Sequence, residues 1–238
     1  MLQRLQQVHP VQTPGLMYKG LEIFQDESVN IHECFHGLNM DTCLQHEHPT
    51  ISGFLQLVDV SDGTVIDRYN IRIVAVPEYP LRFPHVYEIG GRIPKNIDWH
   101  VFPNDGRCCL ATIPEEILTC KKGVNLLGFI EKIVTPYFFS QRYREDHGFF
   151  LKERAHGDKG NIEFFAEIFK TNDLLLIANG LNFIKKRKEP NRVSSCFCGK
   201  DQKYRKCHQE AFRTLSAFSD QELELFIQMI LKYHWCYN

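Results

Sequence analysis

Four potential metal ligands lie close together near the end of this 238-residue chain, and they constrain its fold more than any other feature. The pattern is Cys-x-Cys, then eight residues, then Cys-His, and its members are Cys196, Cys198, Cys207 and His208. Three thiolates and an imidazole can complete a tetrahedron around zinc. The segment that carries them is too short and polar to fold without the metal. We therefore predict a knuckle around a structural zinc with no open position for a substrate. The alternative, a redox role, requires two thiols that are free to exchange.

The same segment resembles the SEC-C motif, which ends the bacterial preprotein-translocase ATPase and occurs in many unrelated proteins. The resemblance rests on Gly199 and on the series Lys203-Tyr204-x-Lys206-Cys207-His208. It implies a docking module. The module is basic, which suits an acidic peptide partner, although the residues are also compatible with a module that has no partner. The basic residues are Lys200, Lys203, Arg205 and Lys206.

Composition narrows the class of protein. With 43% hydrophobic and 12% aromatic residues, the chain can bury one good core and a smaller second one. The formal net charge of −1 provides no field for holding nucleic acid. No apolar run approaches the roughly 18 to 20 residues of a spanning helix, and the first residues lack the apolar core of a signal peptide. We therefore expect a cytoplasmic protein without a nucleic-acid or membrane partner, in which the nine cysteines serve metal binding or catalysis and not disulfides.

Residues 51–87 predict an antiparallel sheet. Residues 51–60 alternate between apolar and polar side chains, residues 61–64 are typical of a turn, and residues 65–76 form a partner strand. Residues 76–87 are extended and contain three prolines, which remove ladder donors, so this segment belongs at an edge or in a loop. Residues 1–50 read as an irregular or helical lead-in.

A cysteine pair follows directly after a turn. Residues 103–106, Pro-Asn-Asp-Gly, precede Cys108 and Cys109, so that a thiol can be held at the lip of the fold. Cysteine can attack a thioester and can then carry the acyl group as a new thioester. The leading interpretation of this stretch is a cysteine acyl carrier.

The order of these features resembles the ubiquitin-conjugating enzyme (UBC) fold over residues 50–142. The resemblance rests on a β-meander, Tyr79-Pro80, Phe83-Pro84, a loop with His100, and Gly106-Arg107-Cys108-Cys109-Leu110. It implies that Cys109 is the acceptor cysteine of a thioester-forming acyltransferase. His100 and Asn104 then become candidates for shaping the loop or stabilising the oxyanion. Asn104 lies nearer to the cysteine than the family's asparagine does, and a plain turn residue is the alternative.

A further resemblance points to a bacterial branch of the family. It rests on His156-Gly157 followed by Gly160 and Glu163, and on the SEC-C ending. Such members occur beside cGAS-like nucleotidyltransferases in CBASS antiphage operons. This implies that Cys109 holds the C-terminal tail of a cGAS-like nucleotidyltransferase or a ubiquitin-like protein, and passes it to an acceptor protein or a small nucleophile. Two alternatives stay open: a noncatalytic UBC-like binding module, and a redox switch made by Cys108 and Cys109.

The expected architecture is α+β: a UBC-like antiparallel β-meander packed on helices, followed by a helical region with the zinc knuckle. We expect helices over 124–141, with a kink or an end at Pro136, over 162–188, and over 220–233. The expected division is a lead-in (1–50), a UBC-like catalytic domain (51–142), a connection and helical extension (143–190), and the SEC-C motif with a terminal helix (191–238).

Overall fold

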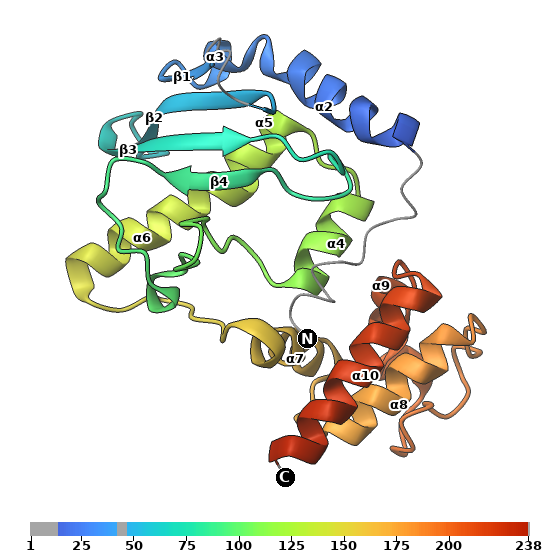
Figure 1. The fold of residues 1–238 in the computed structure, drawn as a ribbon. Coiled ribbons are helices and arrows are strands. Elements are labelled where there is room, and N and C mark those ends of the chain that lie inside the picture. Colours follow the sequence, from blue (N-terminus) through green and yellow to red (C-terminus); the bar gives the residue numbers. More distant parts are fainter. Residues whose placement is uncertain (1–13, 42–46, 238) are drawn as a thin grey trace. The chain divides into compact units, whose positions relative to one another are not determined.

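A computed structural model describes residues 14–41 and 47–237, and these form two compact units (Figure 1). Of the described residues, those from 14 to 111 and from 119 to 153 belong to the sheet unit, and those from 112 to 118 and from 154 to 237 belong to the C-terminal unit. Helix α4 (Ile113–Lys121) contributes residues to both. The other elements of the sheet unit are α2 (Pro14–Ser28), α3 (Ile31–Cys34), β1 (Leu38–Met40), β2 (Thr50–Val58), β3 (Val65–Val74), β4 (His85–Glu88), η1 (Ile97–Trp99), α5 (Leu126–Phe129), η2 (Ile130–Val134) and α6 (Thr135–His147). The C-terminal unit holds α7 (Gly157–Phe169), α8 (Leu174–Lys185), η3 (Tyr204–Lys206), α9 (Gln209–Leu215) and α10 (Asp220–Tyr237).

The sheet has four antiparallel strands in the order β1-β2-β3-β4. The predicted hairpin is confirmed as β2 and β3, and the proline-rich segment supplies the edge strand β4. Strand β1 lies in the segment expected to be an irregular or helical lead-in, which also contains α2 and α3. A strand of three residues is too short for its alternation to be recognised, and only its pairing with β2 defines it. The fold is thus mixed α and β around an antiparallel sheet.

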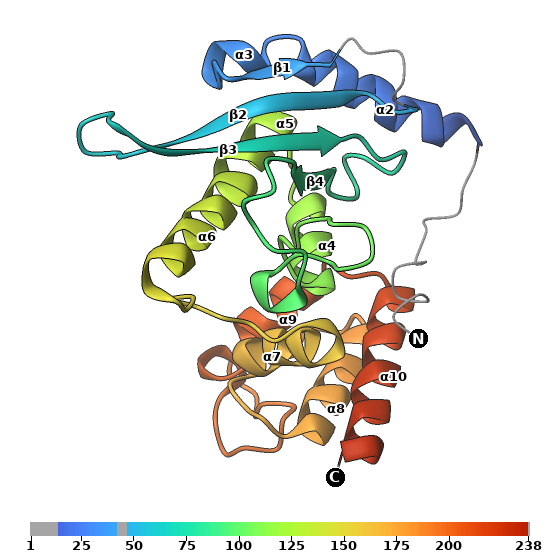
Figure 2. The same ribbon diagram turned by 60° about the vertical axis from the view of Figure 1, so that its left-hand side comes forward.

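One face of the sheet packs on a helical layer. Figures 1 and 2 both show α5, η2 and α6 running along that face. Tyr69 from β3 contacts Phe138 from α6, with ring centroids 4.8 Å apart, and both side chains are buried. The predicted kink at Pro136 is replaced by a π-helical segment, η2, immediately before α6. Proline lacks a backbone N–H, and a wider helical turn accommodates the missing bond, so the chain stays helical through His147.

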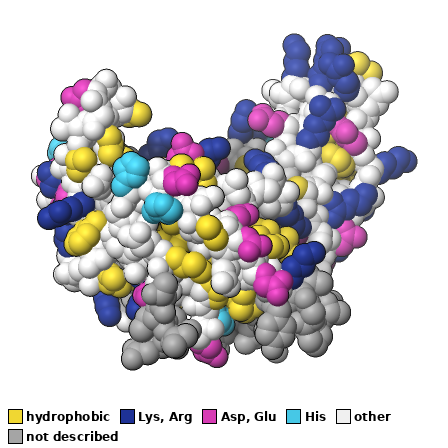
Figure 3. Space-filling model, turned by 90° about the horizontal axis from the view of Figure 1, so that it is seen from above, with side chains coloured by type: hydrophobic (Ala, Val, Ile, Leu, Met, Phe, Trp, Pro, Cys, Tyr) yellow, Lys and Arg dark blue, Asp and Glu magenta, His cyan; other side chains and the backbone are white. Residues whose placement is uncertain are grey.

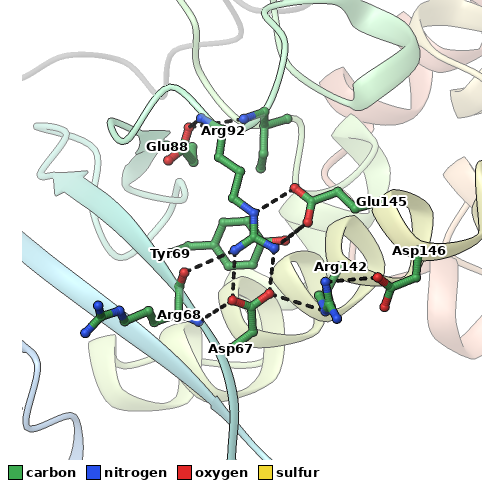
Figure 4. A network of polar contacts seen from close by, with 9 residues as sticks. Asp67, Arg68, Tyr69, Glu88, Arg92, Arg142, Glu145 and Asp146 are labelled. Atoms are coloured by element: carbon green, nitrogen blue, oxygen red, sulfur yellow. Dashed lines mark hydrogen bonds and ion pairs between the residues drawn. The ribbon is translucent and has the colours of Figure 1, made fainter.

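An ion-pair network joins β3, the loop after β4 and α6 (Figure 4). The Arg92 guanidinium donates two hydrogen bonds to Asp67, at 2.8 and 2.6 Å, and its Nε donates to Glu145 at 3.0 Å. It also lies 4.3 Å from the centroid of the Tyr69 ring, whose hydroxyl donates to Glu145. The Glu88 carboxylate accepts the backbone N–H of Arg92 and thereby fixes the loop. Three separate segments therefore depend on one guanidinium.

Replacing Arg92 by methionine should destabilise the sheet unit by about 1–3 kcal/mol, because Asp67 and Glu145 then lose their shared cation. Hydrogen bonding to Arg92 lowers the pKa of the Asp67 carboxyl. A lowered folded-state pKa stabilises the fold above the unfolded value of about 4, and that stability is lost as the pH falls below it. Urea titrations at about pH 7 and about pH 3 should therefore show that the free energy of unfolding falls less on acidification in the variant than in the wild type. An equal decrease in the free energy of unfolding in the variant and the wild type would contradict this account. The matched control is Lys132→Met, which replaces an exposed cation by the same residue.

Helices α7, α8, α9 and α10 all contribute to the core of the C-terminal unit, together with the first part of α4. Phe165 from α7 packs against Phe218 and Phe226, with centroid distances of 6.3 and 5.0 Å. The helix expected over 162–188 is two helices, because Lys170 ends α7 in the left-handed conformation and the Asp173 side chain caps the start of α8. The predicted terminal helix is confirmed as α10, which extends to Tyr237. Within the described residues, none of the helices combines the length and apolar character needed to cross a membrane.

Candidate functional site

The four predicted metal ligands of the C-terminal unit come together. Their ligand atoms all lie within 4.8 Å of one another. The Nδ1 atom of His208 lies 3.3 Å from the sulfur of Cys196 and 3.2 Å from that of Cys207, and the sulfurs of Cys198 and Cys207 lie 3.7 Å apart. A tetrahedral site with metal–sulfur bonds of about 2.3 Å requires sulfur–sulfur edges of about 3.8 Å. The cluster can therefore hold a metal ion.

A short hairpin positions the first two cysteines. Ser195 pairs with Lys203 in an isolated antiparallel bridge, and the backbone N–H of Cys196 donates to the carbonyl of Gln202 at 2.9 Å. Between the two sides the chain turns at Gly199, whose φ of 78° favours glycine. The glycine after Cys-x-Cys is thus a requirement of the backbone, which turns both thiols toward the same point.

A hydrogen bond from the far side of the ring fixes His208. This residue is buried at the start of α9, and its Nε2 lies 2.9 Å from the backbone carbonyl of Phe169 at the end of α7. A carbonyl only accepts, so Nε2 carries the proton and the Nδ1 lone pair faces the cysteines. Such outer partners orient the ligands of metal sites. The role of Phe169 could not be recognised from the sequence, because any residue can supply a backbone carbonyl.

The thiols of the cluster perturb one another. Burial, together with contacts to the thiols of Cys198 and Cys196, raises the pKa of the Cys207 thiol to about 12. Thiolates, not thiols, are the metal ligands, and a bound cation stabilises them and releases their protons. The donor set therefore suits a soft or borderline divalent cation. Without a bound cation, several thiolates held this close together would repel one another.

Purified protein should contain about one metal ion per chain, and Cys198→Ser with Cys207→Ser should lose it. Removal of the ion by a chelator should increase amide exchange over residues 191–208, while strands β2 and β3 keep their protection. Elemental analysis and hydrogen-exchange mass spectrometry measure both effects. The exposed Cys34→Ser is the control that should retain the ion. A metal-free protein with a protected hairpin would contradict the assignment.

In the sheet unit, a second hairpin carries the cysteine pair. Val101 bridges Cys108, and the backbone N–H of Cys109 donates to the carbonyl of His100 at 2.7 Å. The ring nitrogen of His100 and the sulfur of Cys109 lie within 4.8 Å of each other. The structure thus brings two of the three residues singled out in this stretch side by side.

Asn104 lies elsewhere. It is exposed in the turn of residues 103–105 that closes the hairpin, whereas His100 and Cys109 stand at the open end. The position of Asn104 is thus that of an exposed turn residue.

The two adjacent cysteines differ sharply in environment. Cys108 is 5% exposed within the core of the sheet unit, and burial raises the pKa of its thiol to about 12. Cys109 is half-buried. Successive side chains of an extended segment point to opposite faces, which explains the difference. Cys109 is consequently the accessible thiol of the pair. A vicinal disulfide would have to bring Cys108 out of the core.

Helix α6 holds the backbone that leads to this cysteine. Three of its side chains, spaced i, i+4 and i+7 on one face, donate to three consecutive carbonyls. One of the donors, Gln141, is completely buried. The pairs are Tyr137 with His100 at 3.0 Å, Gln141 with Trp99 at 2.8 Å, and Arg144 with Asp98. These positioning residues were not recognised from the sequence, although three polar residues at that spacing are a detectable signal.

Comparisons with protein-family models, with curated proteins and with solved structures found no match to this chain.

Brief treatment of the folded protein with iodoacetamide should modify Cys109 and leave Cys108 unmodified, because only one of the two thiols is accessible. The exposed Cys34 serves as an internal reference for a reactive thiol. Gln141→Leu removes a buried donor, should cost about 1–3 kcal/mol and should accelerate modification of Cys109 relative to Cys34. Peptide mass spectrometry gives both rates. Equal modification of Cys108 and Cys109 in the wild type would contradict this arrangement.

Proposed function

We propose that the sheet unit is a ubiquitin-conjugating-like acyl carrier that forms a thioester on Cys109. One observation carries the proposal: a half-buried thiol ends a loop whose preceding carbonyls are held by three side chains of α6, while the neighbouring thiol of Cys108 is buried. An acyl carrier needs a thiol that a large donor can reach and a backbone that stays in place while the acyl group changes hands. The antiparallel sheet that precedes the loop in the chain also supports the proposed resemblance to the ubiquitin-conjugating enzyme fold.

The proposed reaction is a thioester exchange followed by aminolysis of the new thioester. The Cys109 sulfur attacks the carbonyl carbon of a thioester on an activating partner, a new C–S bond forms, and the donor thiol leaves with the proton of the Cys109 thiol. An amine of the acceptor then attacks the same carbonyl, the bond to Cys109 breaks, and the cysteine returns as a thiol. The acyl group arrives activated, so no strongly lowered thiol pKa is needed.

In this proposal His100 shapes the loop. Its backbone is left-handed, with a φ of 51°, and its carbonyl accepts hydrogen bonds from both Cys109 and Tyr137. Its ring packs edge-on against Phe150, with centroids 4.9 Å apart. These contacts fix the position of the residue through its backbone and ring face, which suits a positioning role better than that of a general base.

The partners in the proposal follow from the resemblance to the bacterial branch. The donor is a protein with a transferable C-terminal tail, of the cGAS-like nucleotidyltransferase or the ubiquitin-like class, and the acceptor is a protein lysine or a small nucleophile. The setting is antiphage defence of the CBASS type.

For the C-terminal unit we propose zinc as the ion. Three sulfurs and one imidazole nitrogen form a soft, four-coordinate donor set, which zinc prefers. With all four positions filled by protein, no open position is left for a substrate, and the ion acts structurally.

The deciding experiment is trapping of the acyl adduct in the native host. Wild-type protein and Cys109→Ser are purified without reductant and compared by gel and mass spectrometry. Serine replaces a labile thioester by a more stable ester. We expect an adduct that thiol removes from the wild type and that persists on Cys109→Ser, and the adduct's mass identifies the transferred tail.

Cys34→Ser and Cys236→Ser are the matched controls, because both cysteines are exposed and should leave the adduct unchanged. If neither wild type nor Cys109→Ser carries an adduct while a partner still copurifies with both, the protein is a noncatalytic UBC-like binding module. An adduct that maps to another cysteine would also overturn the assignment of Cys109.

A further inference from the structure

The charges of the chain are unevenly distributed, although the formal net charge is only −1. Residues 185–206 contain nine basic and two acidic residues. The basic ones are Lys185, Lys186, Arg187, Lys188, Arg192, Lys200, Lys203, Arg205 and Lys206, and the acidic ones are Glu189 and Asp201. The remainder of the chain is correspondingly acidic. The segment begins at the end of α8 and runs through the metal-ligand hairpin, so its charges belong to one unit of the structure.

Two of the nine cations are used within the fold. Lys185 pairs with Glu224 at 2.5 Å, and Arg187 pairs with Asp220 at 2.6 Å while it also donates to the carbonyls of Ser216 and Phe218. The other seven side chains are exposed, and none of them forms an ion pair with another described residue. We call these seven the cationic surface: Lys186, Lys188, Arg192, Lys200, Lys203, Arg205 and Lys206. Figure 3 shows Lys and Arg side chains gathered on one side of the face that it presents.

Backbone and side-chain contacts hold the two halves of this surface together. The N–H of Arg205 donates to the carbonyl of Arg192 at 3.3 Å, and the N–H of Tyr204 donates to the carbonyl of Ser194 at 2.9 Å. The Glu189 carboxylate accepts from both Arg213 and Tyr204, at 3.0 and 3.3 Å, so one of the two local acids is already engaged. The cations therefore stand on a fixed support and not on a loose tail.

The surface has charge but almost no apolar anchor. Among residues 185–206, Val193 is the single large hydrophobic side chain with substantial exposure. Interfaces with folded proteins depend on buried aromatic and aliphatic anchors at their centre. A row of lysines and arginines without such anchors matches a regular polyanion, in which every contact is to a phosphate and carries no sequence information.

We propose that the cationic surface binds the phosphodiester backbone of nucleic acid without sequence preference. This inference goes beyond the proposed acyl transfer and does not depend on it. It also departs from the expectation drawn from net charge, because net charge averages over the whole chain, whereas a phosphate responds to the charges within a Debye length of about 8–10 Å. Binding is electrostatic and falls steeply with salt.

Fluorescence anisotropy of the full chain with two labelled probes of mixed sequence, duplex DNA and single-stranded RNA, tests the proposal. On duplex DNA the plot of log affinity against log salt should be linear, with a slope between about −3.6 and −6.3 for four to seven phosphate contacts. Relative affinity for the two probes shows whether DNA or RNA supplies the backbone. A labelled poly-glutamate of similar length is the third probe, and tighter binding to it would make the surface an acidic-peptide site and overturn the proposal.

The decisive comparison is between two variants with equal net charge. Lys186→Gln/Lys188→Gln/Arg192→Gln removes three charges of the surface that precede the first metal ligand, Cys196, and should lessen the slope by about 3. Lys122→Gln/Lys132→Gln/Lys152→Gln removes three exposed charges of the sheet unit and should leave the slope unchanged. Circular dichroism and metal content verify that both variants fold. The proposal fails if neither nucleic-acid probe binds at low salt, or if both variants lose affinity equally.

Discussion

The sheet unit depends on hydrogen bonds to the backbone of an irregular segment. Residues 98–100 lie outside the four-stranded sheet, and a carbonyl without a partner costs free energy when water is excluded. Helix α6 solves this with three donors at helical spacing, and the same helix buries its apolar face against the sheet. One element therefore serves packing and loop geometry together. The position of Cys109 follows from this, since its own N–H bonds to the last of the three carbonyls.

The Arg92 network also joins separate elements of the sheet unit, here through ion pairs. Asp67 and Glu145 come from different elements, and they tolerate one another because a single guanidinium lies between them and above the Tyr69 ring. The arrangement couples the far end of α6 to β3, and so it fixes the helix whose other residues hold the cysteine loop. Helix α6 thus takes part in the packing of this unit, in its ion pairs and in the hydrogen bonds to the loop carbonyls.

The C-terminal unit depends on a different constraint. Its hairpin is polar and strongly basic, and by itself it buries few apolar side chains, so its stability is tied to the cluster of sulfur and nitrogen donors and to the contact between His208 and Phe169. A metal ion can link α9 through His208 to the hairpin through Cys196. Once the backbone is fixed in this way, the exposed side chains are free to carry charge, which explains how a small segment sustains seven cations without partners among the described residues.

Much of this could be predicted from the sequence, where the signal is local. The hairpin of β2 and β3 follows from alternation around a turn, the terminal helix follows from its apolar stripe, and the four metal ligands follow from their spacing. Local patterns failed where the outcome depends on distant partners. Strand β1 is defined only by its pairing, and the break between α7 and α8 rests on the left-handed Lys170 and the capping Asp173.

What the sequence by itself determined is the chemistry available: three sulfurs with an imidazole, a cysteine pair after a turn, and a basic segment in a chain of balanced charge. Tertiary structure decided which of these groups can act. The resemblance pointed to Cys109, and the pleat of the chain against the core is what buries Cys108 and leaves Cys109 accessible. His100 and Asn104 were both candidates, and the structure places the His100 ring within 4.8 Å of the thiol and Asn104 in the exposed turn. The physical reason is that reactivity depends on burial, neighbours and distance, and long-range packing sets all three.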